Sequence, residues 1–518
     1  MRIIIQKGND VYSLVATSII QGIKSVPVYV EADVSDGMPF FEMVGSLSTE
    51  VKESKERVRT ALKNTGFVLP PKRITVNFIP ANIKKTGSGF DLPVVAAVLS
   101  ALGRLPQEAL ENTMVVGEIG LSGEVMAVNG ILPMVADAKE RGIKCCIVPA
   151  ANYKEAALIK DVKIYAVKSI KEMIHILNGG TYIEKEADYA VKQAESQLDF
   201  SDIQGQKFVK RACEVAVSGM HNLMMIGPPG AGKTMMAMRI PTILPPLEER
   251  EQLELSKIYS VSGMFELREQ LMDKRPFRSP HHTITVRGLT GGGAIPKPGE
   301  ISLAHKGVLF LDELPEFGQN VIETLRQPLE EKTVRLVRAH GTYEYPADFI
   351  LVAALNPCKC GYYPDMNKCR CTSASIERYI NKISQPLLDR IDICVETPQV
   401  KFEELNRKSR EENSKTIRER VMNVHNIQKE RYREESFQFN SQIPAARVKE
   451  FCGLNQNQEK YMEQIYKKLN LTARSYHKIL KVARTLADMD GCEHIKDLHL
   501  NEAVCYRNID KRFWRDAL

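Results

Sequence analysis

The apolar residues of this chain follow two periods, one typical of strands and one typical of amphipathic helices. In the first 180 residues the two periods alternate, so we expect an α/β domain there. The predicted strands lie at 28–34, 74–78 and 144–148, the predicted helices at 51–64, 92–102 and 131–141, and a predicted hairpin spans 115–128 with its turn at Gly123.

Further along the chain, three short runs are apolar throughout, which is the pattern of strands buried on both faces of a sheet. They lie at 221–226, 308–311 and 349–356, and we expect the first two to be neighbours in one sheet. The C-terminal part carries the helical period instead, and it predicts an α-helical domain. Its predicted helices lie at 456–469, 473–488 and 498–507.

The composition is that of a globular protein with more than one domain. Hydrophobic residues make up 43% and charged residues 26% of the 518 positions, and the formal net charge of +7 permits nucleic-acid binding without demanding it. No apolar run reaches the roughly 18 residues of a membrane span, and the apolar core of residues 1–7 is too short for a signal peptide. We therefore expect a cytoplasmic protein with no membrane partner, whose eleven cysteines are free or metal-bound.

The sequence GPPGAGKT, between a predicted strand and a predicted helix, is typical of a phosphate-binding loop. Backbone N–H groups of such a loop, at the N-terminus of a helix, hold phosphate groups. Lys233 is expected to reach the β- and γ-phosphates of ATP, and Thr234 to hold Mg²⁺. The residues expected to contact the nucleotide are Gly227, Pro228, Pro229, Gly230, Ala231, Gly232, Lys233 and Thr234.

Two further predicted strands end in residues that would complete a site for ATP hydrolysis. Asp312 and Glu313 follow the strand at 308–311, where Asp312 can hold Mg²⁺ through water and Glu313 can act as general base on the attacking water. Asn356 ends the next strand and resembles the sensor-1 residue of AAA+ proteins, which implies that its amide orients that water. A turn-forming Asn before Pro357 is the alternative.

The stretch LLDRID resembles the LLDRxD motif of the magnesium-chelatase and MCM helicase branch of AAA+ proteins. The resemblance implies that Arg390 is an arginine finger, which reaches the ATP of a neighbouring subunit. An ion pair between Arg390 and Asp389 or Asp392 is the alternative. Because a finger supplies its charge only when a second subunit docks, the resemblance also implies a ring.

A second arginine, Arg474, stands at the start of a predicted C-terminal helix. It matches the sensor-2 arginine of the same family, which reports the state of the nucleotide to a helical lid. Lys481 and Arg484 lie further along that helix and are weaker candidates for the same role.

Two insertions are expected in the ATP-binding part. Residues 278–304 are rich in glycine and proline and resemble the helix-2 insertion of the same branch, so we expect a mobile loop facing a pore. The adjacent histidines at 281–282 are poorly spaced to bind one metal ion. Residues 332–347 predict a hairpin that turns near His340. In a ring its arginines would follow a phosphate backbone, and a solvated hairpin is the alternative.

Four cysteines form two C-x-C pairs within one short segment that contains glycine and proline. Four thiolates from such a segment can make a tetrahedral Zn²⁺ site, although the spacing is tighter than the usual C-x₂-C. Four reduced cysteines or a redox-sensitive pair are the alternatives. The candidate zinc ligands are Cys358, Cys360, Cys369 and Cys371.

Three stretches of the N-terminal domain, 84–103, 117–125 and 129–144, resemble the proteolytic-domain fold of the Lon family, an S5 domain 2-like fold. A Lon-type protease needs a serine nucleophile and a lysine that activates it. Ser88 stands near the expected serine, but residues 131–133, Ile-Leu-Pro, occupy the place of the lysine. We therefore expect a Lon-like domain that is kept for structure or for binding partners.

The chain is identified as a member of the ComM/YifB family of magnesium-chelatase-like AAA+ proteins. The resemblance implies an α/β multidomain protein that forms a homo-hexamer, hydrolyses ATP and moves on single-stranded or branched DNA to promote branch migration. The implied segments are a Lon-like domain at 1–180, a linker at 181–200, an AAA+ core at 201–400 and a helical lid at 401–518.

Two other functions remain open. A metal-chelatase motor subunit would share the AAA+ core, although the family resemblance implies that such subunits lack the Lon-like domain. An ATP-dependent protease would need the lysine that this chain does not have at the matching position. A comparison of ATPase rates with and without DNA, beside a casein digestion, distinguishes the three functions.

Overall fold

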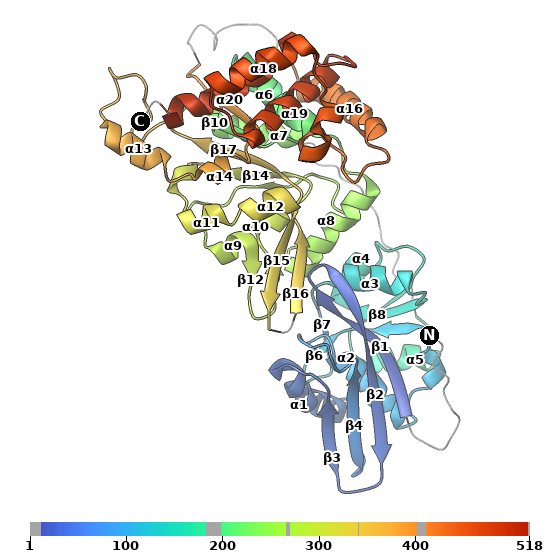
Figure 1. The fold of residues 1–518 in the computed structure, drawn as a ribbon. Helices are drawn as coiled ribbons and strands as arrows, with labels where there is room; N and C mark the ends of the chain where they lie inside the picture. The colour runs from blue at the N-terminus through green and yellow to red at the C-terminus, as the bar shows by residue number, and fades with distance from the viewer. Residues whose placement is uncertain (1–11, 183–197, 266–269, 340, 401–410, 516–518) are drawn as a thin grey trace.

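The computed structural model describes residues 12–182, 198–265, 270–339, 341–400 and 411–515. It is a mixed α/β protein in which three parts follow one another along the sequence (Figure 1). The N-terminal part, in blue, lies at one end of the molecule, the C-terminal helices, in red, lie at the other, and a parallel sheet lies between them. Among the helices in these ranges, none has the length and apolar character needed to span a lipid bilayer.

The N-terminal part is built on a seven-stranded mixed sheet. Its elements are β1 (Tyr12–Gln21), β2 (Lys24–Ser35), β3 (Phe40–Val44), α1 (Thr49–Asn64), β4 (Arg73–Ile79), α2 (Asp91–Ala101), β5 (Thr113–Val115), β6 (Glu118–Ile119), β7 (Val125–Met126), α3 (Ile131–Glu140), β8 (Cys145–Pro149), α4 (Tyr153–Ala156), β9 (Lys163–Val167) and α5 (Ile170–Leu177). The strand order is β3-β4-β2-β1-β5-β8-β9. Helix α2 is apolar on every side, which is why it is buried against β1 and β2.

The central part is built on five parallel strands in the order β11-β14-β17-β10-β18. Its elements are α6 (Lys207–Gly219), β10 (Leu223–Ile226), α7 (Lys233–Ile243), α8 (Glu249–Ser262), β11 (Phe277–Arg278), α9 (Val286–Thr290), β12 (Gly291–Gly292), β13 (Lys297–Pro298), α10 (Glu300–Leu303), β14 (Val308–Leu311), α11 (Gln319–Glu323), α12 (Arg326–Glu331), β15 (Thr333–Arg338), β16 (Gly341–Pro346), β17 (Ile350–Leu355), α13 (Ser373–Ile380), α14 (Gln385–Leu388) and β18 (Ile393–Glu396). Alternate residues of β10 lie in two different hydrophobic cores, so both faces of the sheet are covered.

One expectation about this sheet is wrong. The strand before Asp312, β14, is not a neighbour of β10, because β17 lies between them and pairs with both. Leu223 of β10 is opposite Val352 of β17, and Phe310 of β14 is opposite the same residue on the other side. The strand that ends at Asn356 is therefore the central strand of the site.

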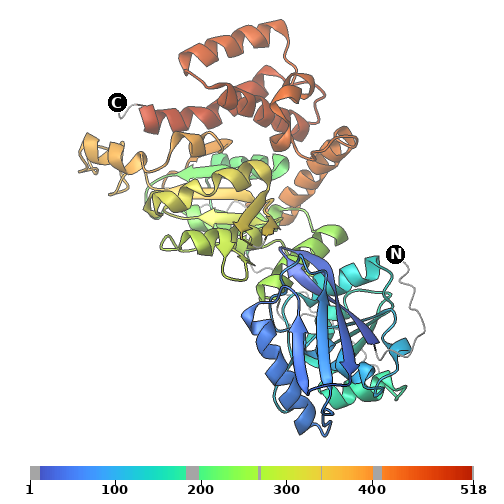
Figure 2. The same ribbon diagram turned by 60° about the horizontal axis from the view of Figure 1, so that its bottom comes forward.

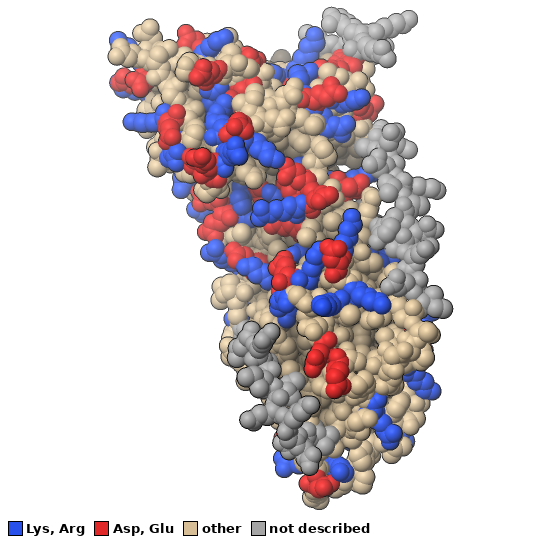
Figure 3. All heavy atoms as spheres, turned by 90° about the vertical axis from the view of Figure 1, so that its right-hand side faces the viewer, with Lys and Arg blue, Asp and Glu red and all other residues tan. Residues whose placement is uncertain are grey.

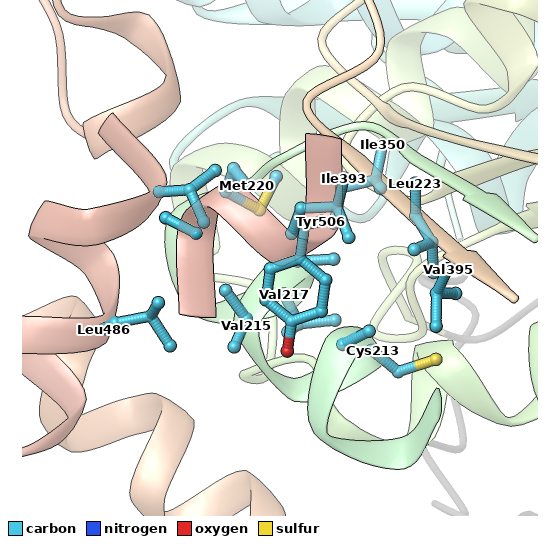
Figure 4. Packing of buried hydrophobic residues seen from close by; sticks show 14 of the residues in the cluster. Cys213, Val215, Val217, Met220, Leu223, Ile350, Ile393, Val395, Leu486 and Tyr506 are labelled. Carbon is cyan, nitrogen blue, oxygen red and sulfur yellow. The ribbon is translucent and has the colours of Figure 1, made fainter. Parts of the chain in front are cut away.

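The C-terminal part is helical, as predicted. Its helices are α16 (Ser414–Arg431), α17 (Val448–Phe451), α18 (Gln456–Lys468), α19 (Ala473–Met489) and α20 (Asp497–Arg515). Helices α16 and α19 pack on α6, and α20 packs on β18. Figure 4 shows part of this core, in which Val217 of α6, Leu486 of α19 and Val395 of β18 belong to one buried cluster.

The insertion at 278–304 is not one loop. It contains α9, the paired strands β12 and β13, and α10. An ion pair between Arg278 and Glu300 (Nε–Oε2 2.6 Å) joins the start of the insertion to α10. The predicted hairpin at 332–347 is confirmed as β15 and β16, while its predicted turn residue His340 lies outside the described residues. Most of the predicted linker, 183–197, also lies outside them, and the predicted domain boundaries stay predictions.

The N-terminal part lies against the central part (Figure 2). Two of the contacts between them involve α3 and the turn between β1 and β2. Helix α3 packs against α8, where the Gly130 N–H donates a hydrogen bond to the Ser260 carbonyl at 3.2 Å. The turn between β1 and β2 lies against β16 of the central hairpin, which points toward it in Figure 1. A side chain at Gly22 would meet the backbone of Glu344, so the two segments are in close contact.

Candidate active site

The predicted phosphate-binding loop connects β10 to α7, as its sequence requires. Lys233 is almost completely buried at the start of α7. Its ammonium group donates to the carbonyls of Gly227 (2.6 Å) and Pro228 (3.0 Å) and to the Asn356 side-chain oxygen (3.0 Å). Burial lowers the pKa of Lys233, and the nearby carboxylates of the site oppose part of that shift. A buried cation with only neutral acceptors is suited to bind an anion.

Three more predicted residues lie beside this lysine. The Thr234 hydroxyl donates to the Asp312 carboxylate at 2.7 Å, so the two oxygens expected to hold Mg²⁺ are adjacent. The other Asp312 oxygen accepts the Glu313 N–H at 2.9 Å. Glu313 has φ +51°, a left-handed conformation that is uncommon for a non-glycine residue and is found at functional sites. Its side chain is 54% exposed, and therefore open to a substrate.

The insertion at 278–304 brings a residue to this site that the sequence did not assign to it. The His282 ring nitrogen lies 3.8 Å from the Glu313 carboxylate, and the His281 ring packs against His282 at an interplanar angle of 35°, with ring centres 4.1 Å apart. The sequence showed only that the histidines are adjacent. Their distance from Glu313 depends on the fold of the insertion, which carries no sequence pattern.

Arg390 and Arg474 lie together in a separate cluster. The Arg390 guanidinium forms an ion pair with Glu330 (2.7 Å), and Arg474 approaches the same Glu330 oxygen at 3.7 Å. Neither Asp389 nor Asp392 is the ion-pair partner of Arg390, so that alternative is wrong. The cluster lines an open cleft of about 770 Å³ between α12, α19 and the start of β18. Among the other cations of α19, Arg484 is bound internally to Asp488.

This arginine cluster and the phosphate-binding loop lie at opposite ends of the parallel strands. The loop follows the end of β10, whereas Asn222, which precedes β10, donates through its side chain to the Arg390 carbonyl at 3.0 Å. Because β10 has four residues, its two ends are about 13 Å apart. The two arginines, Arg390 and Arg474, therefore lie on one side of the molecule, and the phosphate-binding loop of the same chain lies on another.

The four predicted zinc ligands gather in one cluster, with all four sulfur atoms within 4.8 Å of one another. The sulfur of Cys358 lies 3.3 Å from that of Cys360 and 3.7 Å from that of Cys369. These separations are far longer than the roughly 2.05 Å of a disulfide, and they are close to the roughly 3.8 Å expected for thiolates that share a tetrahedral Zn²⁺ at 2.3 Å. Although burial opposes it, hydrogen bonds from Tyr362 and neighbouring thiols lower the pKa of Cys360, whereas burial and the neighbouring thiols raise the pKa of Cys369.

The two insertions meet at their tips. A side chain at Gly292 in the first insertion would contact Arg287 and the Arg338 guanidinium of β15, each at 3.3 Å. Among the described residues, neither arginine has an acidic side chain within ion-pair distance, whereas Arg335 on the same strand pairs with Glu344 at 3.3 Å. Two unneutralised arginines at one exposed tip are suited to bind an anionic ligand.

The N-terminal part does not present a serine–lysine pair at the expected position. The Ser88 hydroxyl donates to the Glu118 carboxylate. The ammonium of Lys85, the lysine nearest to Ser88 in sequence, is buried and bonds to the backbone carbonyls of Phe78 (3.2 Å) and Pro80. Leu132 lies buried at the place of the expected lysine.

Three family models match consecutive parts of the chain. They are described as "Subunit ChlI of Mg-chelatase" at residues 30–152, "Magnesium chelatase, subunit ChlI" at 199–405 and "Magnesium chelatase, subunit ChlI C-terminal" at 411–507. Together they span all three parts of the molecule, including the N-terminal sheet.

Similar proteins match almost the whole chain. Competence protein ComM of Haemophilus influenzae is 40% identical over 94% of this chain and 95% of its own length. The protein YifB of Escherichia coli is 39% identical over 96% of this chain and 97% of its own length. A shorter similarity, 32% identity over 143 residues, exists to Lon protease 2 of Bacillus subtilis, of which it covers 25%.

Proposed function

This chain belongs to the ComM/YifB family of magnesium-chelatase-like AAA+ ATPases, and on that premise we propose that it is a ring-forming motor that moves on DNA. Its AAA+ part supplies ATPase activity, and its substrate is single-stranded or branched DNA. The N-terminal part adopts a Lon-like fold without peptidase activity, since Ser88 bonds to a carboxylate and not to a lysine. The motor acts in the cytoplasm, where ATP, Mg²⁺ and reduced thiols occur together.

ATP hydrolysis uses the cluster at the end of the parallel strands. Lys233 binds the β- and γ-phosphates, and its buried ammonium exchanges its carbonyl acceptors for phosphate oxygens. Thr234 and Asp312 hold Mg²⁺, which when bound offsets the negative charge of the phosphates. Glu313 accepts a proton from the attacking water, and Asn356, which bonds to Lys233, orients that water.

The arginines act on the ATP of a neighbouring chain. Arg390 and Arg474 lie at the end of the strands opposite their own phosphate-binding loop, so they are positioned to contact the phosphate-binding loop of a second copy. Glu330 pairs with Arg390 in the single chain and has to release it for this contact. A positive charge that arrives only on assembly makes hydrolysis dependent on the ring.

The observation that favours DNA as substrate is the pair of unneutralised arginines, Arg287 and Arg338, at the joined tips of the two insertions. Arginines without an acidic partner bind phosphate oxygens and release counterions from the nucleic acid. The face in Figure 3 differs, because there Lys and Arg are interspersed with Asp and Glu and form no continuous basic stripe. The insertion tips are therefore the proposed DNA contact.

Stimulation of the ATPase by DNA tests this proposal. We expect single-stranded and three-strand-junction DNA to raise the ATPase rate of the native chain. Combined substitution Arg287→Ala and Arg338→Ala should reduce this stimulation and lower the slope of log affinity against log salt by about 2. Arg335→Ala is the matched control, because Arg335 is neutralised by Glu344, and it should keep both the stimulation and the slope.

The same assay decides between the remaining classes. A chelatase-type motor would show no DNA stimulation, and the N-terminal part does not exclude it, since its matching family model also carries a chelatase name. A protease would digest casein with ATP. Branch migration on a synthetic junction, with no casein digestion, supports the translocase. A native chain whose ATPase rate is the same with and without each DNA tested contradicts it.

The cysteine cluster holds a structural Zn²⁺ ion in this proposal. Its sulfur separations of 3.3 to 3.7 Å suit tetrahedral thiolate ligands. The purified native chain should contain about one zinc ion per chain, as expected for a closed structural site. Metal analysis and titration of accessible thiols measure this directly, and a metal-free chain with four reactive thiols in the cluster would contradict it.

A further inference from the structure

The cysteine segment touches the phosphate-binding loop. We define the cysteine knuckle as residues 358–371. Within it, Gly361 has φ +85°, and a Cβ atom at this position would lie 2.4 Å from Cδ and 3.1 Å from Cγ of Pro229. No other residue type fits there without displacing one of the two backbones. The knuckle backbone therefore packs directly on a proline ring inside the sequence that binds ATP.

A second connection joins the knuckle to the same site. Cys358 follows Asn356 by two residues, and the Asn356 side chain accepts a hydrogen bond from Lys233 at 3.0 Å. The residue before Asn356, Leu355, accepts the Gly227 N–H at 3.2 Å. The knuckle thus begins directly after the two residues of the central strand, Leu355 and Asn356, that bond to the phosphate-binding loop.

The knuckle has little regular structure to define its shape. Between Leu355 at the end of β17 and Ser373 at the start of α13, the chain contains no helix or strand. Its inner cysteines, Cys358 and Cys369, are buried, and their sulfurs lie 3.7 Å apart. A connection of this kind needs a staple to hold one conformation, and metal–thiolate bonds provide one.

We propose that the zinc-loaded knuckle is a clamp that fixes Pro229 and Asn356, and so sets the affinity of the site for ATP. This inference rests on the zinc ion proposed above. The ion contacts no substrate, and the knuckle residues act through the loop and the strand end, so they are positioning residues. Loss of the ion releases the knuckle, and the loop then has more conformations to lose when ATP binds.

Binding of a non-hydrolysable ATP analogue, measured with Mg²⁺ and without DNA, tests the clamp. The native chain is compared as purified, after removal of zinc with a thiol reagent and chelator, and after reduction and return of Zn²⁺. We expect removal to raise the Kd for the analogue roughly tenfold, within the usual range of coupling between two sites, and Zn²⁺ to restore it.

A matched pair of variants tests the contact without removing metal. Gly361→Ala should keep about one zinc ion per chain and raise the Kd roughly tenfold, because its Cβ displaces Pro229. Gly179→Ala is the control, since Gly179 has a similar φ of +81° but nothing within 4 Å of its Cβ position. The control should bind the analogue as the native chain does.

The outcomes separate this inference from the proposals on which it rests. A native chain that binds no ATP analogue contradicts the ATPase site, and a native chain without metal contradicts the zinc proposal. A zinc-containing chain whose Kd is unchanged both by stripping and by Gly361→Ala overturns the clamp alone. The stripped native chain carries no substitution, so the test holds even if Gly361→Ala fails to fold.

Discussion

In the proposed ATPase site, five single residues bind the nucleotide and carry out its hydrolysis. Lys233 and Thr234 begin α7, Asp312 and Glu313 follow β14, and Asn356 follows β17. Hydrogen bonds join Lys233 to Asn356, Thr234 to Asp312, and the Glu313 N–H to Asp312. The positive charge of Lys233 is buried and satisfied by uncharged oxygens, which leaves it available for phosphate. The Glu313 carboxylate is exposed, and its proposed role is that of the general base that takes a proton from water.

Substitution Glu313→Gln tests that role. We expect ATP binding and ring assembly to persist and turnover to fall by about 10²- to 10⁴-fold, because the amide cannot take a proton from water. Glu316→Gln is the control, since Glu316 is also exposed and pairs only with Lys382 among the described residues, at 3.5 Å. Single-turnover ATP hydrolysis and gel filtration measure the two properties. Retained turnover in Glu313→Gln would remove Glu313 from its role.

The sequence predicts the members of this site better than its surroundings. A glycine-rich loop with lysine and threonine has one structural context, and the two strand ends supply acidic and amide groups at fixed positions. The approach of His282 to Glu313 could not be predicted, because it depends on how the irregular insertion folds. The pairing of Arg390 with Glu330 was missed for a similar reason, since Arg390 lies in a turn and Glu330 lies sixty positions earlier, on α12.

Among the elements, the contact of α16 with α6 carries a pH-dependent group. His425 of α16 is half-buried, and its ring nitrogen lies 3.0 Å from the Val217 carbonyl of α6. Burial lowers the pKa of His425 to about 4, below its ordinary value of 6.5. The unfolded chain therefore takes up a proton at a pH where the folded chain does not, and this contact loses stability as the pH falls from 6.5 toward 4.

A drop from about pH 7.5 to about pH 5 should lower the free energy of unfolding of the C-terminal helices by about 2 kcal/mol through His425. His425→Gln keeps a side-chain donor for the Val217 carbonyl and does not titrate, so it should reduce this loss. The exposed His494→Gln is the control and should leave the loss unchanged. Urea unfolding at the two pH values measures the difference. An equal loss in His425→Gln and the native chain would contradict the assignment.

The hydrophobic period of the sequence predicts which segments are helices or strands more readily than it predicts which strands pair in the sheet. The runs that form β10, β14 and β17 are all apolar, so their pattern predicts burial on both faces but not which strands pair. That ambiguity produced the wrong expectation that β14 adjoins β10. The hairpin of β15 and β16 has no such ambiguity, because its two strands are neighbours along the sequence.

In the whole molecule, the turn between β1 and β2 links the N-terminal part to the proposed DNA contact. Gly22 lies in this turn at φ +68°, and a Cβ there would lie 2.4 Å from the Glu344 carbonyl oxygen of β16. The other strand of that hairpin carries Arg338. No sequence pattern predicts this contact, because it joins segments more than 300 positions apart through backbone atoms.

Gly22→Ala should loosen the N-terminal part from the hairpin. We expect faster amide hydrogen exchange in Gly341–Pro346 and weaker stimulation of the ATPase by DNA. Gly103→Ala has a similar φ of +67° and nothing within 4 Å, so it controls for the roughly 1–2 kcal/mol backbone cost of alanine at positive φ. Exchange in β16 that is the same in both variants would contradict a role for this contact.

The proposed motor depends most on the completion of each ATP site by a neighbouring chain. Lys233→Ala removes the phosphate-binding lysine, and Arg390→Ala removes the finger, so each variant alone should lack DNA-stimulated ATPase activity. Co-expressed in equal amounts, the two should regain about a quarter of the native rate, because about a quarter of the subunit contacts then join an intact loop to an intact Arg390. The measurement is the DNA-stimulated ATPase rate of the co-purified mixture. A mixture as inactive as its components, or an Arg390→Ala chain as active as the native one, would contradict completion between chains.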